Sequence, residues 1–242
     1  MPHPDPSIHP HGRIYLCAPV NALVEGIYEE NIPFSQIKRH GDFGLGTFND
    51  LDGEMVMLDG RVHQIDSDGR IIAVADDQLT PFACVTHFRP SIFAESEGEM
   101  EYDAFLGWLS RLLPSPNLFY AIRIDGLFAS LRARSVPKQV CYRPLVDVAK
   151  EQHVFQFRAT EGTLAGFYTP DYMASLNVPG LHLHFLSYDL TAGGHLLECR
   201  PGKVQAAIQP ISSLELSLPM SHEYLAWDFR RDVGRDLEKA EK

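Results

Sequence analysis

Three histidines lie close together in the sequence with the spacing of a metal site. His182 and His184 are two residues apart, so a strand would point both imidazoles to one face. His195 follows the turn-forming pair Gly193-Gly194. If the runs on either side of this turn pair as antiparallel strands, His195 lies beside the other two histidines. Three neutral imidazoles that converge in this way bind a divalent first-row metal, most often Zn²⁺.

A His-x-His pair alone has a second interpretation. Such pairs also occur on strands where the rings are solvated or make ordinary hydrogen bonds. The third histidine after the turn favours the metal interpretation. Three histidines without a cysteine suit a catalytic site better than a structural one, because structural zinc sites favour closed shells rich in thiolates.

The composition limits the classes of partner. The chain has 242 residues, enough for one large domain or two small ones with a sizeable core. Its 21 Lys and Arg against 32 Asp and Glu give a net charge of −11, which argues against a nucleic acid or an anionic membrane as partner. An anionic substrate would therefore need a cation built into its site.

The cysteines and the N-terminus indicate the compartment. Four cysteines are widely spread without a Cys-x-x-Cys spacing, and the first residues lack the apolar core of a signal peptide. We therefore expect reduced thiols and a cytoplasmic protein. The proline-rich start predicts a loose tail over residues 1–12.

The elements that must position the histidines are mostly strands. Asp-Gly pairs at 52–53, 59–60 and 68–69 predict a β-meander within residues 43–90. A helical spacing over 102–112 ends before Pro114. Further strands are expected at 117–135, 154–159, 163–168 and 204–208, with a helix at 144–152 and a charged, weakly helical tail from residue 225.

These elements predict a mixed α/β fold that is rich in sheet. We expect two packed β-sheet subdomains with a few helices and the metal site in the crevice between them. The first subdomain would cover residues 13–160. The second would cover residues 161–242 and include the metal-binding hairpin and the C-terminal tail.

Several blocks of the sequence resemble the α-acetolactate decarboxylase family. They occur in the order of the family and cover most of the chain, from about residue 25 to residue 219. The blocks are GDFGLGTFNDLDGEM at 41–55, RARSVP at 132–137 with Pro144-Leu145, and VPGLHLHF at 178–185 with Gly193-Gly194-His195.

The resemblance implies a set of site residues. It implies that the three histidines hold Zn²⁺ or another divalent first-row metal, and that Glu54 and Arg134 line the site. It also implies that Thr47 lies in or next to the metal's surroundings. A glutamate near the C-terminus would fold back over the metal, with Glu241 favoured over Glu238. The sequence departs from the family at Ser187-Tyr188-Asp189 and at His63.

The implied reaction is the decarboxylation of 2-acetolactate (2-hydroxy-2-methyl-3-oxobutanoate) to acetoin and CO₂. The ketone and hydroxyl oxygens lie on adjacent carbons and can chelate one metal, which would stabilise an enediolate that is then protonated on one face. Arg134 can hold the carboxylate through a forked pair of hydrogen bonds. Glu54 can accept the hydroxyl proton and carry a proton to carbon.

Two other functions fit the same histidines. A metallohydrolase would use a three-histidine zinc to generate hydroxide and would need a general base for the bound water. A non-catalytic protein would bind a metal or a small ligand without turnover.

The resemblance also implies a homodimer that acts in butanediol fermentation or disposes of excess acetolactate.

Overall fold

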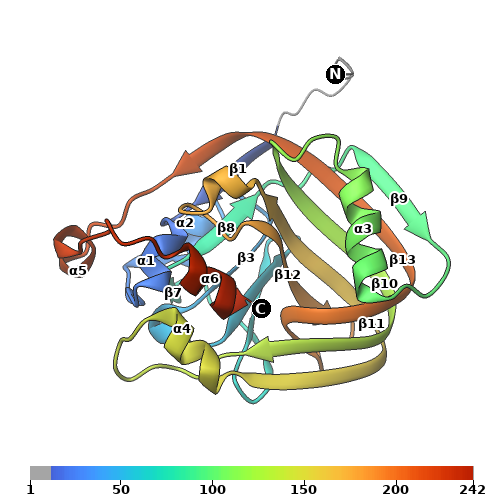
Figure 1. Cartoon of the computed structure of the whole chain (residues 1–242). Coiled ribbons are helices and arrows are strands. Elements are labelled where there is room, and N and C mark those ends of the chain that lie inside the picture. Colours follow the sequence, from blue (N-terminus) through green and yellow to red (C-terminus); the bar gives the residue numbers. More distant parts are fainter. Residues whose placement is uncertain (1–11, 242) are drawn as a thin grey trace.

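The computed structural model describes residues 12–241 apart from the side chains of Glu238 and Glu241, and it consists mainly of strands (Figure 1). The expected tail at residues 1–12 lies outside this range except for Gly12, which begins β1. The strands are β1 Gly12–Leu16, β2 Ile32–Pro33, β3 Phe43–Thr47, β4 Glu54–Leu58, β5 Arg61–Ile65, β6 Ile71–Ala73, β7 Leu79–Thr80, β8 Ala83–Thr86, β9 Ile92–Ser96, β10 Phe119–Ser135, β11 His153–Thr169, β12 Gly180–Ser187 and β13 Gly193–Leu216. The helices are α1 Val20–Val24, α2 Phe34–Ile37, α3 Tyr102–Leu112, α4 Leu145–Val148, α5 His222–Ala226 and α6 Gly234–Glu241, with 3-10 turns η1 Asn49–Leu51, η2 Ala149–Glu151 and η3 Asp171–Met173.

Eleven of these strands form one sheet. β10, β11, β12 and β13 pair in turn, and β13 pairs back with β10, which closes a ring. From β13 the sheet continues through β1, β8, β3, β4 and β5 to β6. The expected sheet-rich α/β class with few helices is confirmed. The expected division between residues 160 and 161 falls inside β11, and strands from both sides of it pair within this one sheet.

The meander appears where the Asp-Gly pairs predict it. β3, β4, β5 and β6 pair antiparallel in sequence order. Asp59 and Gly60 both have positive φ, 51° and 75°, as a two-residue type I′ hairpin turn requires. This turn fixes the register in which Glu54 and Ile65 are partners.

Two long strands of the ring, β10 and β11, were each expected to be broken near a glycine or a turn, but each is one continuous strand in the structure. Gly126 has φ +146°, and a Cβ there would lie 2.3 Å from the Lys203 carbonyl oxygen. This close approach lets β10 bend along β13 and run on for 17 residues. The strands expected at 154–159 and 163–168 are likewise parts of one strand, β11. The helix expected over 102–112 is confirmed as α3.

The two faces of the ring strands pack against different layers. On β12, Leu183 and Phe185 lie in an apolar cluster with Phe105 and Leu109 of α3. Leu186 belongs instead to a cluster that includes core residues of β3 and β4. The even-numbered histidines of β12 therefore face the meander. Within residues 12–241, no helix combines the length and apolar character needed to cross a bilayer.

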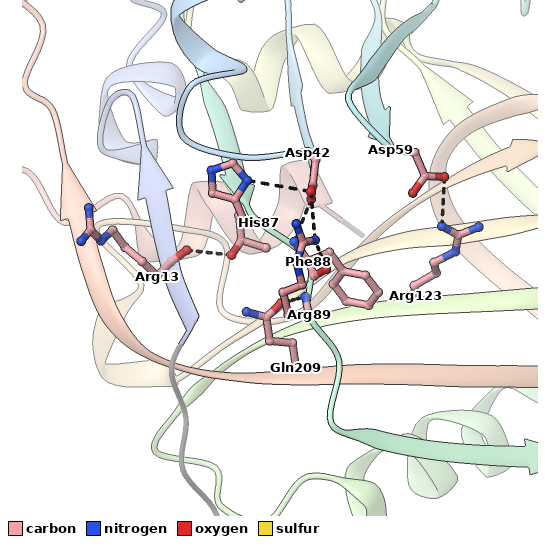
Figure 2. A network of polar contacts seen from close by, with 9 residues as sticks. Arg13, Asp42, Asp59, His87, Phe88, Arg89, Arg123 and Gln209 are labelled. Carbon is pink, nitrogen blue, oxygen red and sulfur yellow. Dashed lines mark hydrogen bonds and ion pairs between the residues drawn. The ribbon is translucent and has the colours of Figure 1, made fainter.

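A surface network of polar contacts joins strands that are far apart in sequence (Figure 2). Asp42, just before β3, accepts from the Arg89 guanidinium at 3.1 Å and from the Phe88 backbone N–H at 2.7 Å. The Arg89 backbone N–H donates to Gln209 of β13 at 2.7 Å. These contacts hold the end of β8 against both β3 and β13.

Candidate active site

The structure brings the three histidines together in the interior. β12 and β13 pair antiparallel with His184 opposite His195, as the sequence predicts. His182 Nε2 lies 3.2 Å from both His184 Nε2 and His195 Nδ1. All three side chains are buried, and their ligand atoms lie within 4.8 Å of one another.

The turn between β12 and β13 keeps this register. Ser187 N–H donates to the Ala192 carbonyl at 2.8 Å, and Ala192 N–H donates back to Ser187 Oγ at 2.9 Å. Asp189 is exposed and accepts from the Ser187 and Thr191 hydroxyls, which hold the pKa of its carboxyl below the usual value. The residues that depart from the family here therefore build the turn rather than the histidine group.

Burial keeps His182 and His184 neutral. It lowers the pKa of His182 to about 3, with a further contribution from the Arg134 charge. It also lowers the pKa of His184 well below the usual value. His184 Nδ1 lies 2.8 Å from the Met55 carbonyl of β4, so Nδ1 carries the proton and Nε2 presents a lone pair towards His182.

The three histidines fit a metal ion. Zinc–nitrogen bonds of about 2.0 Å in tetrahedral geometry place two ligand nitrogens about 3.3 Å apart, close to the separations found here. Neutral imidazoles whose ring nitrogens face one another leave opposed lone pairs that a cation would satisfy. This donor set suits Zn²⁺ and other first-row divalent ions.

A buried ion pair lies beside the histidines. Arg134 Nη1 donates to Glu54 Oε1 at 2.7 Å, and the two residues are only 4% and 6% exposed. The second carboxylate oxygen, Oε2, lies 3.5 Å from His184 Nε2. In the sheet, Arg134 of β10 is the direct partner of His195, so the ladder that aligns the histidines also sets the arginine.

Thr47 supports Glu54 from the neighbouring strand. The two residues are partners across β3 and β4, and Thr47 Oγ1 donates to the Gly53 carbonyl at 2.7 Å. Gln64 Nε2 donates to the Asp52 carbonyl at 2.6 Å in the same turn. Sequence reasoning missed Gln64 and the Met55 carbonyl, because neither residue type indicates a site by itself.

The functional groups share a small cavity of about 30 Å³. His63 is not among the described residues that line it. Its apolar wall comes from residues to which sequence reasoning gave no role, although four of them lie in the blocks that resemble the family. They are Val20, Leu23, Leu51, Phe82, Val136, Leu145 and Val178.

The C-terminal helix reaches this cavity. Arg134 Nη2 donates to the Ala240 carbonyl of α6 at 3.2 Å. α6 ends at Glu241, whose side chain lies outside the described part of the chain, as does that of Glu238. The expected role of Glu241 therefore stays a prediction.

A cavity that combines imidazoles, a guanidinium and a carboxylate with an apolar wall is organised as an enzyme site. Comparisons with known proteins agree. The profile of the family described as alpha-acetolactate decarboxylase matches residues 14–231. An alpha-acetolactate decarboxylase from Methanosarcina mazei is 41% identical over 240 residues, which is 99% of this chain and 83% of the relative. One from Brevibacillus brevis is 37% identical, over 96% of this chain and 82% of the relative.

A solved structure matches as well. The crystal structure of alpha-acetolactate decarboxylase from Bacillus subtilis strain 168 superimposes with a TM-score of 0.92 at 35% identity, covering 95% of this chain and 99% of that chain. The fold and the site thus define a carboxy-lyase, an enzyme that cleaves a carbon–carbon bond with release of CO₂. The chain belongs to the alpha-acetolactate decarboxylase family.

Proposed function

We propose that this enzyme converts 2-acetolactate to acetoin and CO₂ with a divalent metal, Zn²⁺ in the first place, held by His182, His184 and His195. One observation carries the proposal: three buried imidazoles converge within 3.2 Å contacts beside the Arg134–Glu54 pair. When bound, the metal supplies Lewis-acid stabilisation of the negative charge that decarboxylation leaves on the ketone and hydroxyl oxygens.

Arg134 holds the substrate carboxylate. Its guanidinium presents a rigid fork that matches two carboxylate oxygens, and it provides the local positive charge that a chain of net charge −11 needs for an anionic substrate. Loss of CO₂ then removes the anion from the fork. The apolar wall of the cavity holds the methyl groups and excludes water, which strengthens each charged interaction inside.

Glu54 is the residue that transfers the proton in this proposal. One of its oxygens faces Arg134 and the other faces His184, so the carboxylate lies between the place of the substrate carboxylate and the metal ligands. From this position it accepts the hydrogen bond of the substrate hydroxyl and delivers a proton to the carbon that loses CO₂. Delivery from one fixed side gives one enantiomer of acetoin. Thr47 acts behind Glu54 by fixing the turn that carries it.

The direct test is to incubate metal-loaded protein with racemic 2-acetolactate and to measure CO₂, acetoin and the acetoin enantiomers. We expect equal amounts of CO₂ and acetoin and one enantiomer. Ester or amide hydrolysis without acetoin formation would favour the metallohydrolase alternative. Stoichiometric metal binding without turnover of either kind would favour a binding protein.

A homodimer in the cytoplasm is part of the same proposal. Burial raises the pKa of Cys17 to about 12, and all four cysteines are unbridged, which suits a reducing compartment.

The segment around α5 exposes Met220, Leu225 and Trp227, apolar side chains that suit a subunit contact. Light scattering should give twice the mass of the chain, and the mass of one chain would contradict the dimer.

A further inference from the structure

Helix α6 packs beside residues that line the cavity. Val233, Leu237 and Ala240 are spaced by four and three residues, form one face and are buried. They pack in the same apolar cluster as Val20 and Leu23, which line the cavity. In Figure 1 the red α6 lies beside α4, with which it is in contact.

The same helix accepts a hydrogen bond from Arg134, the residue that binds the substrate carboxylate in the proposed function. The Ala240 carbonyl accepts from Arg134 Nη2, while Glu54 accepts from Nη1. The cavity of about 30 Å³ has room for about one water molecule. A branched five-carbon anion is several times larger, and the Ala240 carbonyl has to leave Nη2 before both arms of the Arg134 fork can bind the carboxylate.

Arg231 fastens this helix to the body. Its Nε donates to Glu25 Oε1 at 2.9 Å, and its Nη1 donates to Asp236 Oδ2 at 2.6 Å. Glu25 is buried and follows α1, whereas Asp236 is in the first turn of α6. The Arg231 guanidinium therefore joins the first turn of α6 to the end of α1, and residues of α1 line the cavity. The neighbouring Arg230 pairs with Asp228 at the surface.

We propose that α6 is a lid and that Arg231 is the positioning residue that holds it closed. Closure places the Ala240 carbonyl on Arg134 and shields the metal ligands. Opening frees the guanidinium edge for the substrate carboxylate. This inference rests on the proposed function, in which Arg134 holds that carboxylate.

The test compares Arg231→Gln with Arg230→Gln, a neighbouring arginine that does not contact α6 in the described part of the chain. Zinc-loaded protein is mixed with the chelator 4-(2-pyridylazo)resorcinol, and the rate of zinc extraction is measured. Amide hydrogen exchange of residues 234–241 is measured in parallel without substrate. Arg231→Gln should increase both rates about threefold to tenfold, the range for loss of a half-exposed charge network. Arg230→Gln should leave both unchanged.

Three further variants make the test more specific. Glu25→Gln should reproduce part of the effect of Arg231→Gln, because it removes one of the two Arg231 contacts. The double variant should add little to Arg231→Gln, which already removes the contact with Glu25. Arg231→Lys should restore part of the closure. Equal rates in Arg231→Gln and Arg230→Gln would overturn the lid, and so would faster exchange throughout β12 and β13 rather than in α6 alone. If the wild type binds no zinc, the proposed metal chemistry fails, while exchange in α6 still decides the lid.

Discussion

At the scale of single residues, Glu54 and Arg134 have two tasks. As a buried pair they neutralise each other, which keeps two charges in an apolar cavity without an unpaired ion. Each also faces a reacting group, because Glu54 Oε2 approaches His184 and the Arg134 fork faces the cavity. Their substitution should therefore affect catalysis, and a change that leaves the partner charge unpaired should also lower stability.

Glu54→Gln should keep the fold and the metal but lose proton transfer. The amide oxygen still accepts from Arg134, whereas the amide group cannot shuttle a proton. We expect kcat to fall about 10²–10⁴-fold with a smaller change in KM. Glu198→Gln, at an exposed glutamate that pairs with Arg132, is the matched control and should be neutral. Continued cleavage with racemic acetoin would restrict Glu54 to the protonation step.

Arg134→Lys should be strongly impaired although it keeps the charge. Lysine lacks the planar fork, so it cannot hold a carboxylate through two parallel hydrogen bonds as arginine does. Steady-state kinetics should show a large loss in kcat/KM, and Arg132→Lys on the exposed neighbour should show none. Wild-type kcat/KM in Arg134→Lys would rule out the carboxylate clamp.

Glu30 gives a prediction about pH. Burial raises the pKa of its carboxyl, so the folded chain keeps this proton at a pH where the unfolded chain releases it. Stability therefore falls as pH rises from the ordinary glutamate pKa through the raised one. Glu30→Gln keeps an acceptor for the Ser221 hydroxyl and should raise Tm at pH 7, with the gain shrinking at pH 4. The exposed Glu29→Gln is the control, and an equal gain there would contradict this account.

At the scale of elements, the β12–β13 hairpin depends on Gly194. This residue has φ +138°, and a Cβ there would lie 2.6 Å from the Arg134 carbonyl oxygen. Gly180 at the start of β12 also has positive φ, +75°, but open space around it. An alanine at Gly180 would therefore add backbone strain alone. An alanine at Gly194 would add backbone strain and also displace Arg134.

Gly194→Ala should lose both stability and activity, whereas Gly180→Ala should lose only stability. The left-handed conformation costs an alanine about 1–2 kcal/mol at either position. At 194 the clash also pushes β10 away, so the activity per folded molecule should fall. Thermal unfolding and kinetics on the same samples separate the two effects. Equal specific activity in both variants would show that Arg134 tolerates the shift.

The hairpin also shows how far the sequence could predict the site. The three histidines are close in sequence: His182 and His184 alternate on one strand, and His195 follows the turn. Strand geometry alone therefore predicts that their side chains converge. The Glu54–Arg134 contact spans 80 residues, and only the family resemblance placed the two in one site. The continuous sheet was not predicted, and only the family resemblance brought the C-terminal segment to the site. Strand partners at long range and the docking of a short helix depend on packing that leaves no local pattern.

At the scale of the whole molecule, the metal should stabilise the fold. The histidines lie on two ring strands and contact β4 through the Met55 carbonyl, so an ion there ties the ring to the meander. A ligand at 100 times its Kd adds about 2.7 kcal/mol to the free energy of unfolding. Zinc removal should therefore lower Tm in the wild type and not in His184→Ala. The same Tm with and without zinc would contradict a metal bound by these residues.

The pairing of β1 with the far end of β13 has a consequence for synthesis. Gly12–Leu16 lies parallel to residues 211–216, so the first described strand waits for a partner made some two hundred residues later. On a nascent chain, β1 can pair with β8 long before β13 is made, but its other edge stays unpaired until then. The sheet therefore closes late in synthesis, once β13, the second strand of the histidine hairpin, has been made.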